Sequence, residues 1–177
     1  MSILKVARMG HPVLRRRARA VEKSEIKSAA IQRLIDDMID TMAEYHGVGL
    51  AAPQIHESLR IFVAAINGED EPQAGETPEP IAVINPEITV VDNEAVEDWE
   101  GCLSIPDIRG RVPRAREIKV RAYDRHGDRF ELRAHDFPAR VIQHETDHLD
   151  GILFFDRMRS FESLTFLDEY SRYWAKD

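Results

Sequence analysis

The stretch Gln143–His148, which reads QHETDH, is the most informative part of this 177-residue chain. On an α-helix, residues four positions apart project from nearly the same side, so His144 and His148 can reach one metal ion. Glu145 lies about 100° round the helix from His144, where its carboxylate can touch a water on that ion without binding the metal. The stretch therefore predicts a helix that carries two metal ligands and a general base.

A metal site with two imidazoles needs a further protein ligand, and the single cysteine of the chain, Cys102, is the candidate. It lies in Glu100–Ser104, which reads EGCLS. On its own, a cysteine is more often a small buried apolar residue, and a His-x-x-x-His pair is more often solvated. Together, one thiolate and two neutral imidazoles suit zinc, iron(II), cobalt or nickel, but not calcium or magnesium. Three protein ligands leave a position open for water, as catalytic sites do.

Composition limits the class of protein. A chain of 177 residues and 20.3 kDa is expected to form one domain, residues 1–177, that buries roughly 70% of its extended-chain surface. The net charge of −8 and the pI near 5.4 argue against nonspecific binding of nucleic acid. One cysteine excludes an internal disulfide framework and fits a reducing compartment. No apolar run is long enough to span a membrane, and no targeting segment is evident, so we expect a cytoplasmic protein.

An early basic cluster allows two interpretations. Its members are Arg15, Arg16, Arg17 and Arg19. The ordinary interpretation is a solvated loop or helix face, and the alternative is a contact with RNA.

Two amphipathic helices are predicted from the spacing of apolar residues. The first covers about residues 25–45, with Ser24 or Ser28 as its N-cap and Gly47 at its end. The second contains QHETDH, with Asp136 as its N-cap and Gly151 just past its C-terminus.

The remaining pattern predicts strands, one loop and a helical tail. Apolar or alternating runs predict strands over residues 61–66, 81–84 and 88–91 and a later hairpin that turns at Gly127, while the acidic segment 67–80 predicts a surface loop and residues 160–174 a closing helix. The regular alternation of a parallel β-α-β fold is absent. We therefore expect an α+β fold with mostly antiparallel sheets packed around a central metal-binding helix, with a C-terminal helix.

A third short stretch, Gly47–Gln54, follows the first predicted helix and reads GVGLAAPQ. With EGCLS and QHETDH it completes a set of three motifs, and in this order they resemble those of the peptide deformylase family: G-x-G-L-A-A-P-Q, E-G-C-L-S and Q-H-E-x-D-H. The resemblance runs from residue 1 to about residue 160. Three separate motifs are far more specific than His-Glu-x-x-His, which many metallohydrolases share.

The resemblance implies a metal site and a general acid/base. Cys102, His144 and His148 match the ligands of the metal, which in this family is physiologically iron(II) and is readily replaced by nickel, cobalt or zinc. Glu145 matches the general acid/base. The resemblance therefore implies that this chain is a hydrolase that acts in protein biosynthesis.

The same resemblance implies how the substrate is bound. Gln54 and the backbone N–H of Leu103 match the groups that stabilise the tetrahedral oxyanion, and Val48 and Gly49 match the segment that pairs with the substrate backbone as a strand. The substrate is the N-formyl-methionyl end of a new polypeptide, and the products are formate and a free amino terminus. The expected partners are this nascent polypeptide and, transiently, the ribosome; no membrane and no specific nucleic acid are expected.

Two parts of the chain depart from the family pattern or lie outside it. Phe137, Arg140 and Val141 fall where residues of the methionine pocket are expected. Arg140 is more polar than an apolar pocket suggests, so its role stays open. One alternative is that its side chain points outward. The segment 159–177 carries no family signature.

Several other functions can be compared with the same residues. A metzincin protease would need a histidine at the position of Phe154, although Gly151 fits its pattern. A thermolysin-like protease would use Glu162 or Glu169, which are more simply interpreted as solvated charges. Nothing favours a non-catalytic metal-binding module, whereas a relative that hydrolyses another N-acyl group stays open.

Overall fold

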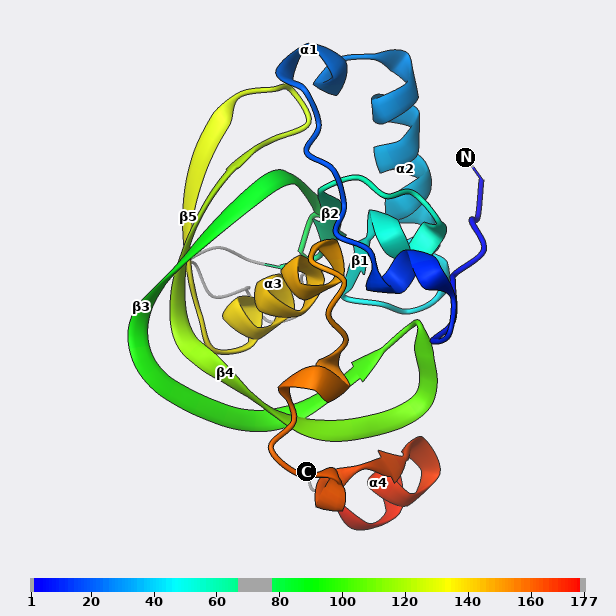
Figure 1. Cartoon of the computed structure of the whole chain (residues 1–177), viewed down its shortest axis with the longest axis vertical. Helices are drawn as coiled ribbons and strands as arrows, with labels where there is room; N and C mark the ends of the chain where they lie inside the picture. Colours follow the sequence, from blue (N-terminus) through cyan, green and yellow to red (C-terminus); the bar gives the residue numbers. More distant parts are fainter. Residues whose placement is uncertain (1, 67–77, 176–177) are drawn as a thin grey trace.

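An antiparallel sheet dominates the structure, a computed structural model that describes residues 2–66 and 78–175. Its strands follow the order β1-β2-β3-β4-β5, and every neighbouring pair is antiparallel. They are β1 (Gly49–Ala51), β2 (Ile61–Ala64), β3 (Ile81–Cys102), β4 (Ile105–Tyr123) and β5 (Arg129–His135). The long strands β3 and β4 curve around helix α3 (Asp136–Leu149), which lies in the middle of the molecule (Figure 1). The predicted α+β fold around a central helix is confirmed.

The other elements are short, apart from α2. They are η1 (Pro12–Arg15), α1 (Lys23–Ile26), α2 (Ala29–Glu44), η2 (Ala52–Ile55), η3 (Phe154–Arg157), η4 (Phe161–Ser163), β6 (Thr165–Phe166) and α4 (Leu167–Tyr173). None of the described helices combines the length and apolar character that a membrane crossing needs. Most of the surface loop predicted at 67–80 lies outside the described residues.

The first predicted helix is divided into α1 and α2. Ser28 separates them, and its hydroxyl accepts a hydrogen bond from the N–H of Ile31 at 3.3 Å, so the Ser28 cap is confirmed. The end differs from the prediction, because the left-handed residue is His46, with φ of 54°, rather than Gly47. A glycine is required at position 47 for a different reason, namely that a side chain has no room there: a Cβ would lie 2.9 Å from Cδ1 of Leu103.

Helix α3 ends as predicted and begins one residue earlier than predicted. Its N-cap is His135, and Asp136 is already its first residue. At the other end Gly151 has φ of 74°, its N–H donates to the carbonyl of His148, and the N–H of Ile152 donates to the carbonyl of Asp147. This pair of bonds is a Schellman motif, which satisfies carbonyls that the last turn leaves free.

Strand β3 is continuous where the sequence predicted two strands broken by Asn85–Pro86. Asn85 adopts φ of 53°, and the pairing with β4 shifts register between Ile84 and Glu87. The Asn85 side chain accepts from the N–H of Val21 at 2.9 Å and donates to its carbonyl at 2.8 Å. The irregularity is therefore a bulge held by a distant segment, and the strand continues to Cys102.

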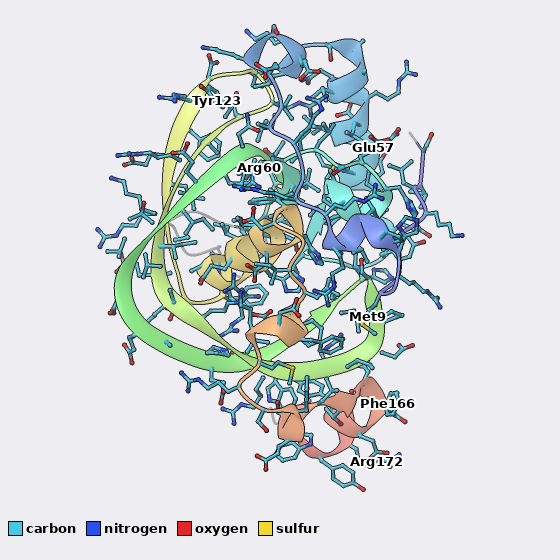
Figure 2. The ribbon with its side chains drawn as sticks, viewed as in Figure 1. Met9, Glu57, Arg60, Tyr123, Phe166 and Arg172 are labelled. Carbon is cyan, nitrogen blue, oxygen red and sulfur yellow. The ribbon has the colours of Figure 1, made fainter. Side chains whose placement is uncertain are left out.

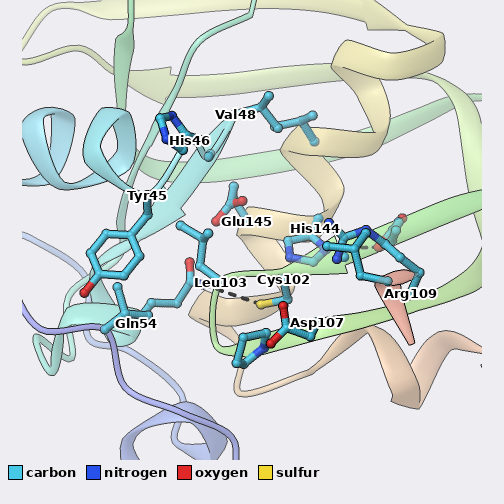
Figure 3. A pocket seen from close by; sticks show the side chains of 18 of the residues that line it. Tyr45, His46, Val48, Gln54, Cys102, Leu103, Asp107, Arg109, His144 and Glu145 are labelled. Atoms are coloured by element: carbon cyan, nitrogen blue, oxygen red, sulfur yellow. Dashed lines mark hydrogen bonds and ion pairs between the residues drawn. The ribbon is translucent and has the colours of Figure 1, made fainter. Parts of the chain in front are cut away.

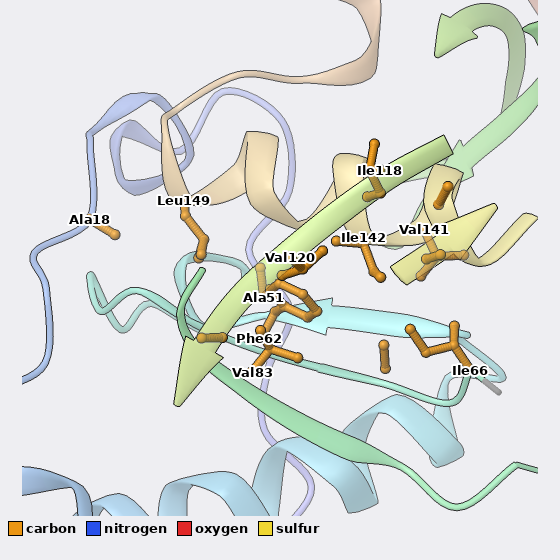
Figure 4. Packing of buried hydrophobic residues seen from close by; sticks show 14 residues of the cluster. Ala18, Ala51, Phe62, Ile66, Val83, Ile118, Val120, Val141, Ile142 and Leu149 are labelled. Atoms are coloured by element: carbon orange, nitrogen blue, oxygen red, sulfur yellow. The ribbon is translucent and has the colours of Figure 1, made fainter. Parts of the chain in front are cut away.

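The core secures α3 against the sheet. Ile142 is fully buried and belongs to an apolar cluster with Phe62 of β2 and Val120 of β4 (Figure 4). Each such side chain contributes about 1.5–3 kcal/mol of hydrophobic stabilisation relative to exposure. A second cluster packs α2 against β1 and β2, including the fully buried Ile35 and Leu50. Helix α3 is thereby packed against β2 and β4 by the first cluster.

The tail contains less helix than predicted over residues 160–174. Thr165 and Phe166 pair with Arg109 and Ile108 of β4 as strand β6, so α4 starts only at Leu167. Phe166 is 64% exposed and lies at the edge of the molecule (Figure 2).

The early basic cluster forms exposed ion pairs. Arg15 pairs with Asp156, and Arg19 pairs with Glu25 at 2.9 Å. This arrangement favours the interpretation as a solvated surface.

Candidate active site

Helix α3 and the end of β3 bring three metal-ligating side chains to one point. One ligand atom each from Cys102, His144 and His148 lies within 4.8 Å of the others. Cys102 Sγ is 3.3 Å from Nε2 of His148. Ligand atoms held about 2.0–2.3 Å from one tetrahedral metal lie roughly 3.3–3.7 Å apart, so this spacing fits a metal ion. Figure 3 shows Cys102 and His144 facing the same space.

Glu100 orients the first imidazole. Its Oε2 is 2.9 Å from Nδ1 of His144. A carboxylate only accepts, so Nδ1 carries the proton and Nε2 keeps its lone pair for a metal. Burial acts to lower the pKa of His144, but hydrogen bonds with Cys102 and Glu100 outweigh it and raise this pKa, so a metal ion would have to displace a proton from Nε2 when it binds. Burial lowers the pKa of His148, which keeps that imidazole neutral as a ligand must be.

Glu100 is itself held by two buried arginines. Arg114 donates to both carboxylate oxygens, at 2.9 and 3.0 Å, and Arg140 donates to one of them at 2.8 Å. Burial acts to raise the pKa of Glu100, yet His144 and Arg114 overcome this and hold it well below its ordinary value. The carboxylate therefore stays ionised.

Arg140 does not point outward. This excludes the outward-pointing side chain, one of the alternatives that the sequence left open. It is 6% exposed, and besides Glu100 it donates to the carbonyls of Val112 and Val96, each at 2.7 Å. It thus joins α3 to both long strands. Sequence reasoning assigned no role to Glu100 or Arg114, although Glu100 stands in the EGCLS motif.

Asp147 extends this charge network along α3. Its carboxylate accepts from the buried Arg114 and from Arg157 at 2.7 Å. Removing one partner of a buried ion pair costs roughly 3–5 kcal/mol, because it leaves an uncompensated charge. The network therefore fixes α3, which carries both imidazoles, against β4.

Glu145 lies beside the metal ligands on α3 and is 4% exposed. One of its oxygens, Oε2, has no hydrogen-bond partner within the described part of the chain. Burial raises its pKa to about 7, with a smaller opposing effect from His144. Gly49 of β1 is packed against it, since a Cβ on Gly49 would lie 2.4 Å from Oε1. The carboxylate is thus confined with a free oxygen available to a ligand.

Gln54 has its amide oriented by neighbouring groups. Its Oε1 accepts from the N–H of Ala51 at 2.8 Å, so its NH₂ group faces the other way. That group donates to Oγ of Ser104 at 3.2 Å and approaches Sγ of Cys102 at 3.5 Å. Leu103 follows Cys102 in the turn between β3 and β4. Both groups predicted to bind an oxyanion therefore adjoin the ligand Cys102.

A cleft of about 800 Å³ opens over these groups. Val48, 46% exposed, lies on its rim, while Gly49 behind it is buried. Phe137 and Val141 of α3 line it as well. All the site residues predicted from the sequence line this cleft except His148, which is buried and belongs to the cluster with Cys102 and His144.

Comparisons with known proteins agree with this arrangement. The family model for polypeptide deformylase matches residues 3–163. Peptide deformylase 2 of Nostoc sp. is 46% identical over 176 residues, which cover 99% of this chain and 97% of that protein.

Two solved structures have the same fold. One is the Met-Ala-Ser-bound class I type b peptide deformylase of Acinetobacter baumannii, with a TM-score of 0.80 and 40% identity over 89% of this chain and 99% of that one. The other is the peptide deformylase of Thermotoga maritima, with a TM-score of 0.79 and 40% identity over 90% of this chain and 100% of that one. With its metal-binding cluster, its cleft and these matches, the chain belongs to the polypeptide deformylase family.

Proposed function

We propose that this chain is a metal-dependent hydrolase that removes the formyl group from the N-terminal formyl-methionine of newly made polypeptides. One observation carries the proposal: a Cys/His/His cluster at the floor of a cleft, with a buried carboxylate beside it. Water cleaves the formyl C–N bond, and formate and a free amino terminus are released. Membership of the deformylase family supports this reaction.

The metal is assigned to Cys102, His144 and His148, with iron(II) as the physiological ion. Nickel, cobalt or zinc should substitute, because one thiolate and two imidazoles suit all four ions. A bound ion supplies Lewis acidity, which lowers the pKa of water and polarises a carbonyl group. Glu100 keeps the Nδ1 proton of His144 in place and so directs the other ring nitrogen at the ion.

Glu145 acts as the general acid/base in this proposal. Its unpaired Oε2 takes a proton from the attacking water and then delivers it to the departing amine, which is a poor leaving group as an anion. The close packing of Gly49 restricts where the carboxylate can lie.

Gln54 and the backbone N–H of Leu103 are proposed to donate to the oxyanion. The Gln54 amide is already oriented by Ala51 and Ser104, so it needs no rearrangement when charge develops. By analogy with other oxyanion holes, each donor contributes on the order of 3 kcal/mol to the transition state.

The substrate backbone is proposed to lie extended along Val48 and Gly49, adding a strand beside β1. Its methionine side chain would then enter the apolar part of the cleft near Phe137 and Val141. The Met-Ala-Ser complex of the Acinetobacter relative supports a methionine-first peptide as the ligand. We further predict that residues 1–177 act as one catalytic domain, in the cytoplasm and in transient contact with the ribosome.

The test is an anaerobic assay of formate release from formyl-Met-Ala-Ser, with metal content measured on the same preparation. We expect turnover in proportion to bound metal, and loss of turnover on chelation. Release of formate by metal-free protein, or none from fully loaded protein, would overturn the proposal.

Two alternatives are separated by further arms of this assay. Acetyl-Met-Ala-Ser should react far more slowly, because the acetyl methyl must fit where the formyl group has only hydrogen and because it makes the carbonyl less electrophilic. Equal kcat/KM for the two substrates would indicate a broader N-acyl hydrolase. Cys102→Ser should abolish activity, whereas a thermolysin-like protease with a glutamate ligand would tolerate it.

A further inference from the structure

The tail of the chain forms part of the wall of the active cleft. Leu167, the first residue of α4, lines the cleft together with Trp99 of β3. The family model ends at residue 163, so Leu167 lies beyond the part that it matches. The sequence alone assigned this segment no function.

The position of Leu167 is fixed from both sides. Before it, Phe166 and Thr165 pair with Ile108 and Arg109 of β4. After it, the rings of Tyr170 and Trp174 pack on Trp99, with centroids 5.0 and 5.8 Å away. An apolar side chain anchored in this way provides a defined surface.

Arg109 continues this wall to the metal ligands. A Cβ on Gly101 would lie 2.2 Å from Nη1 of Arg109, so the guanidinium covers the backbone next to Cys102. The same Nη1 donates to the carbonyl of Ile108 at 2.9 Å, which keeps it beside β6. The wall that Leu167 completes therefore belongs to the same cleft as the metal site.

We propose that Leu167 and Trp99 form a subsite for an apolar side chain on the third residue of the substrate. The inference rests on the proposed function, in which the peptide lies extended along Val48 and Gly49. Side chains of an extended peptide alternate, so the first and third point to the same side, roughly 6.6–6.8 Å apart. A methionine placed between Phe137 and the metal site thus directs the third side chain toward the wall formed with α4.

The test compares formyl-Met-Ala-Leu with formyl-Met-Ala-Ser on the metal-loaded enzyme. We expect kcat/KM to be about tenfold higher for the leucine peptide than for the serine peptide, because an added apolar contact in a binding pocket typically gives discrimination of this size. In Leu167→Ser this ratio should fall toward one. Tyr173→Ser is the matched control, because Tyr173 lies on the same short helix, is 59% exposed and is not among the residues that line the cleft.

Further arms keep the inference falsifiable. Leu167→Phe retains an apolar residue and should move the preference toward smaller third residues even if Leu167→Ser disturbs α4. A wild-type ratio near one, or an unchanged ratio in both Leu167 variants, would overturn the subsite. A Leu167-dependent preference at the second residue would overturn the assigned register. Failure of the proposed function is distinct, since then no formyl peptide would release formate.

Discussion

Adding one methyl group at Gly49 should slow the enzyme strongly by displacing Glu145. A Cβ at this position would lie 2.4 Å from Oε1 of Glu145 and 2.8 Å from both Cδ and Cγ. Ordinary contacts are 3.4–4 Å, so the groups must separate by about 1 Å at Oε1. Gly49 pairs with Ala64 in the sheet, and its neighbour Leu50 is fully buried, so the strand resists movement. The Glu145 side chain must therefore move.

The expected loss follows from that displacement. Misplacing a reacting group by about 1 Å costs on the order of 10²-fold in rate, and overpacking a core costs about 1–3 kcal/mol of stability. We expect Gly49→Ala to retain metal and to lower kcat for formyl-Met-Ala-Ser by about 10²-fold. Metal analysis, formate release and urea unfolding of the same preparation measure the three quantities.

Two comparisons make this prediction refutable. If the methyl group acts only through Glu145, then adding Gly49→Ala to Glu145→Gln should cause no further loss of kcat. Gly127→Ala is the control, because Gly127 has φ of 77° and its Cβ would have ordinary contacts only; it should lower stability by about 1 kcal/mol and leave kcat unchanged. Wild-type kcat in Gly49→Ala, or additive losses in the double variant, would refute the reasoning.

The remaining predictions concern the metal, the acid/base, the oxyanion and the charge network. Glu145→Gln should keep metal and lose several orders of magnitude in kcat because an amide cannot accept the proton, and a variant with near-normal kcat would make Glu145 a bystander. His148→Ala should lose metal, activity and the stability that metal binding adds, so stoichiometric metal by elemental analysis would contradict its assignment as a ligand. Gln54→Ala should lower kcat more than it raises KM, because the oxyanion exists only after attack; steady-state kinetics showing a change in KM alone would count against it. Arg140→Met should lower the free energy of unfolding by about 3–5 kcal/mol because it leaves Glu100 without one buried partner and frees two carbonyls, and urea unfolding within error of wild type would reject that role.

The sequence was sufficient for the cluster of reacting groups because each motif is contiguous. QHETDH lies within two turns of one helix, so helical spacing alone places His144, His148 and Glu145. Cys102 was assigned by its motif, since nothing local indicates that β3 ends beside α3.

Features that depend on distant contacts could not be predicted. Arg140 is buried because Glu100 and two strand carbonyls accept its hydrogen bonds, and these acceptors lie 28 to 44 residues away in the chain. Asn85 was interpreted as a break in a strand because its stabilising contact with Val21 is also remote. The helix predicted in the tail is shortened for the same reason, since β6 forms only against β4.

The buried charges around Glu100 have a consequence for the exchange of one metal for another. An apolar interface would allow α3 to slide by a turn against the strands at modest cost, whereas Arg114 and Arg140 can be neutralised only in the observed register. We therefore expect the three ligands to be held in place before any ion arrives. Iron, nickel, cobalt or zinc would then enter the same ready-made cage, and the protein would change its metal without refolding.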